Sequence, residues 1–262
     1  MNILDQLADY ARYRVAEAEK KIPETEMRRQ AEAMDSDTGF PFEKALAAPG
    51  ISFITEVKKA SPSKGLIAPD FPYLEIAEDY QKAGASAISC LTEPKWFQGS
   101  DQYLKEIAEH VSIPVLRKDF TVSPYMIWQA KTLGASAVLL ICAILDEKEL
   151  KEYREIAAGV GLSALVEAHD EKEVDMALRS GARIIGVNNR NLKDFTVDIR
   201  NSERLRKLIP EDIIFVSESG IRTADDVARL RKNGTDAVLI GETLMRSRDK
   251  KGMLDALRGG IS

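Results

Sequence analysis

The sequence predicts a single (β/α)8 barrel, an α/β fold of the TIM-barrel type, over residues 1–262, with residues 1–50 as an N-terminal helical extension. One sequence pattern recurs four times: a helical stretch, a small residue, a glycine and an apolar run rich in strand-forming residues. Its glycines, at 84, 134, 181 and 234, are 50, 47 and 53 residues apart. A βα unit needs roughly 25 residues, so each interval holds two units.

The strands are expected to be short apolar runs, and the stretches between them have helical periodicity, as in 103–108 and 224–230. Asp146 and Thr223 stand where helix N-caps belong, and the repeated glycines suit helix C-termini. Nearly continuous apolar strands indicate a parallel sheet covered on both faces. An open doubly wound sheet is the alternative, although no GxGxxG follows the first strand. The expected strands lie within 51–58, 83–91, 113–118, 133–141, 162–167, 180–187, 213–218 and 233–240.

The first 50 residues lie outside the repeat. Their opening stretch has apolar residues at helical spacing, which predicts an extra helix. That helix is expected to cover either the lower end of the barrel or the face that carries the active site. The apolar positions are Leu4, Leu7, Ala8, Ala11 and Val15.

The composition of the chain argues against several classes of protein. The 37 Lys and Arg against 42 Asp and Glu give a net charge of −5, which offers no basic field for nucleic acid or an anionic membrane. We find no transmembrane-length apolar run and no secretion signal, so a cytoplasmic location is expected. Cys90 and Cys142 lie in apolar runs and are expected in the core, and two histidines without a ligand cluster argue against a metal site.

Charged residues end several of the apolar runs. In a barrel these ends form the catalytic face. Glu56 and Lys58 share one face of their strand, about 7 Å apart along it, while Lys118 and Glu167 end two further runs. Burial would move the pKa values of such groups toward neutrality, which suits proton transfer. The plainer alternative is that each charge is the first solvated residue after its strand.

The last two strands are followed by glycines that could admit a phosphate. Ser219 and Gly220 follow one strand, and Gly241 and Glu242 follow the other. The Glu242 side chain is expected to point outward, so that its amide alone contributes. The alternative is that these glycines only form the tight turns between a strand and the next helix. The loop 59–65, with two lysines, two hydroxyls, a proline and a glycine, suits a mobile anion-binding lid or equally a solvated connection.

Four further residues receive simple expectations. Trp96 and Phe97 either line the site of an aromatic substrate or pack in the core. Arg117 should face away from the cavity because side chains alternate along a strand. His169, just past Glu167, is assigned no role.

Read in order, these positions resemble the indole-3-glycerol phosphate synthase family. The resemblance runs from about residue 1 to 258 and touches seven of the eight strand ends. Thr243 stands where many members have serine, at a position where the backbone matters more than the hydroxyl. The matching strings are ITEVKKASPS at 54–63, PVLRKDF at 114–120, LVE at 165–167, GVNNRNL at 186–192, SESGI at 217–221 and GETLM at 241–245.

The resemblance implies ring closure of an anthranilate joined through its amine to 1-deoxyribulose 5-phosphate, with loss of CO2 and water. Lys118 would protonate the ketone oxygen, and Glu167 would serve the later proton transfer and dehydration. Lys58 would bind the carboxylate or phosphate and is a second candidate for first proton donor; Glu56 would position Lys118 or stabilise charge on the anilino nitrogen.

The remaining family positions imply binding roles. Asn188 would orient Glu167 and the sugar hydroxyls, while Ser61 and Arg190 would help to hold the carboxylate. The amides of Ser219, Gly220, Gly241 and Glu242 would hold the phosphate. No cofactor or metal is implied. The expected partner is a phosphorylated small molecule, and a monomer is favoured.

Two other functions compete with this one. The first is a related phosphate-binding barrel that isomerises an aminated ribose phosphate, which would be expected to use Cys or Asp with Asp rather than Glu56, Lys58 and Lys118. The second is a catalytically silent scaffold, which has no reason to keep buried Lys–Glu pairs that cost stability when imperfectly paired.

Overall fold

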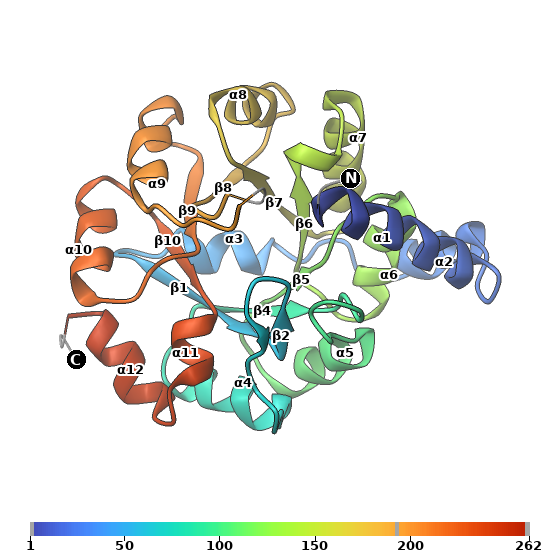
Figure 1. The fold of residues 1–262 in the computed structure, drawn as a ribbon. Helices are drawn as coiled ribbons and strands as arrows, with labels where there is room; N and C mark the ends of the chain where they lie inside the picture. The colour runs from blue at the N-terminus through green and yellow to red at the C-terminus, as the bar shows by residue number, and fades with distance from the viewer. Residues whose placement is uncertain (1–2, 192–193, 260–262) are drawn as a thin grey trace.

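Eight parallel strands close into a barrel in a computed structural model that describes residues 3–191 and 194–259 (Figure 1). Around the barrel the order is β1-β10-β9-β8-β7-β6-β5-β4. The predicted TIM barrel is therefore confirmed, and each strand lies in or next to its predicted run. The strands are β1 (Ser52–Val57), β4 (Ala87–Leu91), β5 (Val115–Lys118), β6 (Ala137–Ile141), β7 (Ser163–Ala168), β8 (Ile184–Asn188), β9 (Ile214–Glu218) and β10 (Ala237–Ile240).

Helices follow the strands and surround the barrel. Asp146 and Thr223 form capping boxes at the starts of α7 and α10, as their sequence predicts. Gly84, Gly134, Gly181 and Gly234 all have positive φ where a helix has just ended. The helices are α4 (Tyr73–Lys82), α5 (Asp101–His110), α6 (Pro124–Thr132), α7 (Glu147–Gly159), α8 (Glu171–Arg179), α9 (Arg200–Leu205), α10 (Ala224–Lys232), α11 (Glu242–Arg246) and α12 (Lys250–Leu257), with 3-10 turns η1 (Cys142–Ile144) and η2 (Arg206–Leu208).

Alternation along each strand divides the core in two. In β1, Phe53 and Val57 pack outward against the helices, whereas Ile54 packs inside the barrel with residues such as Leu116 and Leu165. Glu56 shares the inward face with Ile54. The interior is thus apolar below and charged at the carboxyl ends of the strands. Cys90 and Cys142 are buried and free, as predicted.

The N-terminal extension covers both ends of the barrel. It consists of α1 (Ile3–Glu19), α2 (Glu24–Glu32) and α3 (Pro41–Leu46). Phe42 and Leu46 of α3 pack into the interior cluster and close its lower end. Leu4 and Leu7 of α1 line the cavity at the opposite face. Of the two locations left open for the predicted helix, α1 therefore takes the face with the cavity, and a different helix, α3, closes the lower end. The boundary of the extension at residue 50 and the single-domain organisation of the chain stay predictions.

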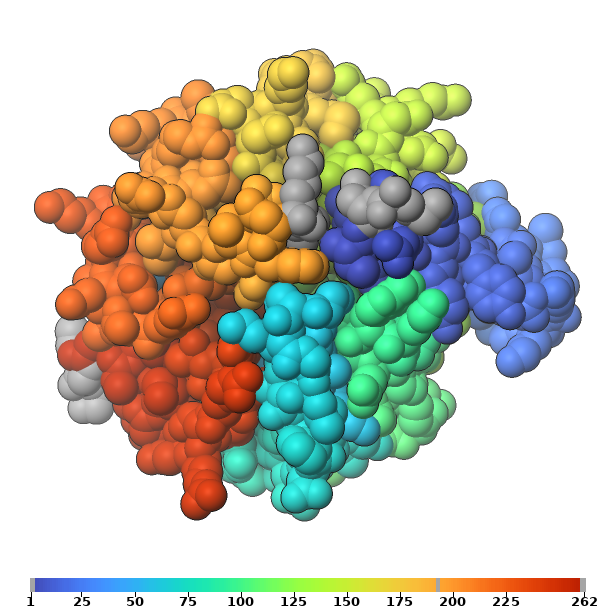
Figure 2. Space-filling model, viewed as in Figure 1, coloured from blue at the N-terminus to red at the C-terminus, as the bar shows by residue number. Residues whose placement is uncertain are grey.

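The loop after β1 is more ordered than its composition indicates. It forms an antiparallel hairpin of β2 (Ala60–Ser61) and β3 (Gly65–Leu66). Figure 2 shows this hairpin, in cyan, on the same face of the molecule as the dark blue α1. Among the described residues, no helix is long and apolar enough to cross a membrane.

Candidate active site

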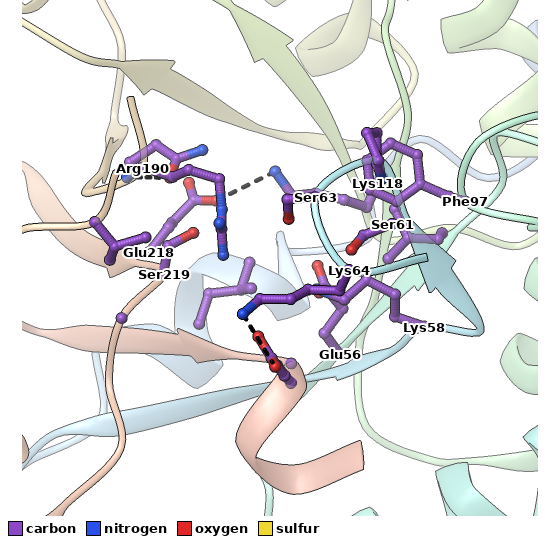
Figure 3. Close-up of a pocket in the computed structure, with 18 of the residues that line it drawn as sticks. Glu56, Lys58, Ser61, Ser63, Lys64, Phe97, Lys118, Arg190, Glu218 and Ser219 are labelled. Carbon is purple, nitrogen blue, oxygen red and sulfur yellow. Dashed lines mark hydrogen bonds and ion pairs between the residues drawn. The ribbon is translucent and has the colours of Figure 1, made fainter. Parts of the chain in front are cut away.

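A cavity of about 450 Å³ opens at the carboxyl ends of the strands. Its floor is made by charged residues that end β1, β5, β7 and β9, and its walls include the β2–β3 hairpin and the start of α1. Figure 3 shows Glu56 and Lys58 from the end of β1, Lys118 from β5 and Glu218 from β9 around this space. Residues far apart in the chain therefore gather at one site, as expected for the catalytic face of a barrel.

Lys118 lies at the centre of the charged floor. Its Nζ is 2.8 Å from Glu167 Oε2 and 3.2 Å from Glu218 Oε2. Both carboxylates are almost fully buried, and Lys118 is only slightly exposed. One ammonium therefore faces two carboxylates where water screens little.

This arrangement sets the protonation of the three groups. Burial disfavours the charged form of each, but the neighbouring charges outweigh it for two of them. The carboxylates of Glu167, Glu218 and Glu56 raise the pKa of Lys118, and Lys118 lowers the pKa of Glu167. For Glu218, burial and the negative charge of Glu167 outweigh Lys118 and raise the pKa to about 7. The expected shift toward neutrality is thus wrong for Lys118 and Glu167, because they neutralise each other.

Glu56 and Lys58 form a second pair at the edge of the cavity. Lys58 follows the last residue of β1, and its Nζ contacts Glu56 Oε1. The predicted sharing of one face is confirmed. Gly241 lies against this pair: a Cβ added there would be 2.3 Å from Glu56 Oε1 and 2.8 Å from Lys58 Nζ. The absence of a side chain at 241 therefore leaves room for both charged groups.

The loops after β9 and β10 carry the expected phosphate-binding residues. Ser219 and Gly220 have positive φ values of 69° and 85°, which turns the chain sharply after the strand. Asn189 Nδ2 donates to the Ser219 carbonyl at 3.0 Å and holds this turn in place. Ser219, Gly220 and Gly241 all line the cavity.

Glu242 differs from expectation, because its side chain is directed to Lys64, which lines the same cavity, instead of pointing away from it. Its Oε1 lies 3.1 Å from Arg246 Nε and 3.7 Å from Lys64 Nζ of the hairpin, a contact drawn as a dashed line in Figure 3. Burial raises the pKa of Glu242, but the two cations outweigh this and lower it. The carboxylate is therefore held ionised and neutralised, which reduces its repulsion of an anion.

Asn188, Arg190 and Ser61 also line the cavity, but Asn188 is bound differently from expectation. Asn188 Oδ1 accepts a hydrogen bond from the Arg190 backbone at 3.0 Å, and the described residues show no hydrogen bond between Asn188 and Glu167. Arg190 Nη1 donates to the Phe195 carbonyl at 3.5 Å. In this structure Asn188 shapes the loop that carries Arg190.

Comparisons with known proteins decide the family. The family model for indole-3-glycerol phosphate synthase matches residues 4–257. A protein of that name from Ruminiclostridium cellulolyticum is 58% identical over 98% of this chain and 99% of its own length. Another, from Lacticaseibacillus casei, is 50% identical over 98% of each chain.

The chain belongs to the indole-3-glycerol phosphate synthase family. The resemblance read from its strand-end strings is thereby confirmed, and the isomerase and scaffold alternatives are set aside.

Solved structures support the fold alone. Thiamine phosphate pyrophosphorylase from Pyrococcus furiosus superposes with a TM-score of 0.61 at 16% identity, covering 83% of this chain and 96% of its own. A chain of the tryptophan synthase α2β2 complex from the same organism gives 0.59 at 16% identity, covering 79% and 97%. Both likenesses are too distant in sequence to carry function.

Membership of the family does not by itself test the site residues, but the geometry brings them together. All eleven expected residues line the one cavity: Glu56, Lys58, Ser61, Lys118, Glu167, Asn188, Arg190, Ser219, Gly220, Gly241 and Glu242. Phe97 also lines it, whereas Trp96 packs edge-on against Tyr10. Arg117 faces outward as predicted and donates to the Met126 carbonyl at 2.9 Å.

Sequence reasoning assigned no role to Glu218, although it touches Lys118. The signal was present, because Glu218 ends an apolar run as Glu167 does. In the structure, Gly186 on the neighbouring strand leaves room for Glu218, because an added Cβ there would be 2.2 Å from Glu218 Oε1. No group of three or more metal-ligating side chains occurs in residues 3–191 and 194–259.

Proposed function

We propose that the chain converts 1-(2-carboxyphenylamino)-1-deoxy-D-ribulose 5-phosphate to indole-3-glycerol phosphate, CO2 and water, as a carboxy-lyase of L-tryptophan biosynthesis. The observation that carries the proposal is the contact of Lys118 with Glu167 and Glu218 in a cavity lined by glycine-rich phosphate loops, within a chain of this family. The reaction requires an acid, a base and two anion sites, and the cavity offers residues for each.

Three anchors would hold the substrate. The amides of Ser219, Gly220, Gly241 and Glu242 would bind the phosphate, with Lys64 above them. Lys58, Arg190 and Ser61 would bind the carboxylate. Phe97 and Phe120, whose rings are tilted by 42° at a centroid distance of 6.1 Å, would contact the aromatic ring. Binding energy from the phosphate orients the reacting carbons without taking part in the chemistry.

Ring closure would use Lys118 as acid. The ring carbon that bears the carboxylate attacks the ketone carbon, and the carbonyl electron pair moves to oxygen, which takes a proton from Lys118. The ring nitrogen becomes positive, and Glu56 would stabilise that charge. An ammonium already in place in a poorly solvated pocket stabilises the developing alkoxide strongly.

Loss of CO2 and water would complete the product. The bond to the carboxylate breaks and its electrons restore the aromatic ring. Glu167 then takes a proton from the carbon beside nitrogen while the new hydroxyl leaves as water. Lys58, released from the departed carboxylate, would supply the proton to that hydroxyl. Asn188 would fix the loop that carries Arg190.

The setting of the enzyme is also a proposal. We place it in the cytoplasm, because its two cysteines are free and buried, which fits a reducing compartment. We propose a monomer, because the expected residues of the site all come from one chain. Sedimentation of the purified chain tests the second point directly.

The test of the activity is indole fluorescence on adding substrate to purified protein. We expect wild-type turnover, and a loss of at least about a hundredfold in kcat for Lys118→Ala and for Glu167→Gln with the fold retained. Lys105→Ala, an exposed change on α5, is the control. Absence of product from the wild type would reject the reaction, and unimpaired Lys118→Ala and Glu167→Gln would reject the assigned roles.

A further inference from the structure

His169 lies beside the proposed base on the side away from Lys118. It is the first residue after β7, two positions past Glu167, so both side chains leave the strand on the same side. His169 Nε2 is 3.4 Å from Glu167 Oε1, while Lys118 holds the other oxygen, Oε2, at 2.8 Å. Nε2 is buried and has no hydrogen-bond partner among the described residues, so its approach to Glu167 is an ion-pair contact and not a hydrogen bond. The carboxylate of Glu167 thus lies between an ammonium and an imidazole.

Glu173, on α8, fixes the imidazole from its far side. One oxygen, Glu173 Oε2, accepts from the His169 backbone at 2.8 Å and lies 2.9 Å from His169 Nδ1. This contact places a hydrogen on Nδ1 and directs Nε2 toward Glu167. Asn201 Nδ2 donates to the His169 carbonyl at 3.1 Å and ties the same turn to α9. One contact with the ring and two with the backbone of His169 therefore fix its position from outside the catalytic cavity.

The charges around His169 favour the imidazolium. Burial lowers its pKa, but the contacts with Glu167 and Glu173 outweigh burial and raise the pKa to about 10. Lys118 lies beyond Glu167, and a second cavity on the other side holds charges of both signs: Asp5, Asp170, Arg190, Asp198, Arg200 and Arg204. Glu167 therefore faces two cations, Lys118 at the catalytic cavity and His169 behind it.

We propose that His169, held by Glu173, is a positioning residue that orients Glu167 and keeps it ionised for its part in the reaction. The inference rests on the proposed function and deepens it. The Glu173–His169–Glu167 row, which we call the acid–histidine row, acts on the reaction only through Glu167, because His169 does not line the catalytic cavity. Without His169, Glu167 would lose one of its two cationic contacts and would rotate more freely.

Two substitutions of His169 separate its contact with Glu173 from its contact with Glu167. His169→Asn keeps a donor near the place of Nδ1 and loses the contact with Glu167, whereas His169→Gln keeps a donor near the place of Nε2. We expect His169→Asn to lower kcat about tenfold with KM nearly unchanged, and to move the acid limb of the pH–rate profile upward because the pKa of Glu167 rises. His169→Gln should keep kcat within about threefold of wild type.

A double variant of His169 and Glu173 gives a second test of the proposal. Glu173→Gln should lower kcat less than His169→Asn does, and should add nothing when combined with it, since both act through one ring. His110→Asn is the matched control, because His110 also faces a glutamate, Glu78, but on the exposed surface. Thermal unfolding of each variant separates a loss of fold from a loss of turnover.

A titration of the His169 ring by NMR needs no turnover. Glu167→Gln should lower the midpoint of this titration, since it removes a negative neighbour. An unchanged midpoint would overturn the inference, as would wild-type kcat and acid limb in His169→Asn, equal loss in His169→Gln, or additive losses with Glu173→Gln. Absence of product from wild-type protein would instead reject the proposed function, so the two failures are distinguishable.

Discussion

Glu218 approaches Lys118 from the opposite side of the barrel, with its Oε2 3.2 Å from the Lys118 Nζ. Its other oxygen, Oε1, is buried and has no hydrogen-bond partner among the described residues. Burying an oxygen without a hydrogen-bond partner costs free energy when the carboxylate is charged. Proximity to Glu167 adds repulsion, so Glu218 holds a proton more strongly than an ordinary glutamate.

The raised pKa of Glu218 predicts how stability depends on pH. Between the ordinary value of 4.5 and about 7, the folded chain keeps a proton on Glu218 that the unfolded chain has released. Stability from this group is therefore present below pH 4.5 and is lost as pH rises through 7. We expect urea unfolding across this window to show that the free energy of unfolding falls with pH in the wild type and does not fall in this way in Glu218→Gln. Equal slopes in the two proteins would contradict the prediction, and Glu109→Gln, an exposed change, is the control.

Gly186 should be needed for the position of Glu218. In Gly186→Ala the new Cβ would lie 2.2 Å from Glu218 Oε1 and 3.1 Å from Leu165 Cδ1, so the carboxylate must move away from Lys118. We expect kcat to fall about tenfold and stability to fall by about 1–3 kcal/mol from overpacking. Gly159→Ala, at the end of α7 with nothing within 4 Å of the added Cβ, is the matched control. Wild-type kcat in Gly186→Ala would show that Glu218 does not depend on this space.

Arg14 should hold α1 over the active site. Its Nη2 lies 2.6 Å from Oδ1 of the buried Asp119, the residue after Lys118. Among the described residues, Arg14→Ala leaves this carboxylate with Thr92, the Phe120 backbone N–H and a more distant Arg117 as its only cation, so we expect a loss of about 3 kcal/mol in the free energy of unfolding. A rise in KM larger than the fall in kcat should accompany it, since α1 lines the cavity.

The control for α1 is on the same helix. Arg12→Ala removes an exposed pair with Asp9 and should change stability by less than about 0.5 kcal/mol. Chemical denaturation and steady-state kinetics measure both effects. Equal behaviour of Arg14→Ala and Arg12→Ala would refute a docking role for Arg14.

Lys64 and Glu242 should affect phosphate binding in opposite directions. Lys64 reaches from the hairpin toward the proposed phosphate loop, and Glu242 places a carboxylate at the same loop. Lys64→Ala should raise the Kd for inorganic phosphate about tenfold, because it removes a cation and leaves Glu242 less neutralised. Glu242→Gln should lower this Kd. Calorimetric titration at low salt measures both, Lys59→Ala is the control, and changes of the same sign would contradict the arrangement.

The strand ends could be predicted in detail because barrel strands impose a simple rule. Glu56, Lys118 and Glu167 each follow a buried apolar run, and parallel strands bring such ends to one face. The eight strands could be placed for the same reason, since burial on both faces leaves continuous apolar runs. Family strings then added Asn188 and Arg190, which charge at strand ends alone would not distinguish.

Other features depended on contacts between distant parts of the chain. The outward orientation predicted for the Glu242 side chain is wrong, because the sequence does not show that Lys64 and Arg246 neutralise it. The predicted shift of the pKa values of Lys118 and Glu167 toward neutrality is wrong, because the sequence indicates their burial and pairing but not that the two charges lie 2.8 Å apart. Nor does the sequence show that His169 lies 3.4 Å from Glu167.

By itself the amino-acid sequence determined the barrel, the helix caps, the family and the set of residues at the catalytic face, since these follow from local periodicity and from strand ends that must meet. Only the tertiary structure decided which charges touch. A contact such as His169 with Glu167, or Arg14 with Asp119, depends on distances of a few ångströms between side chains, and the energy of a buried charge changes sign with its partner.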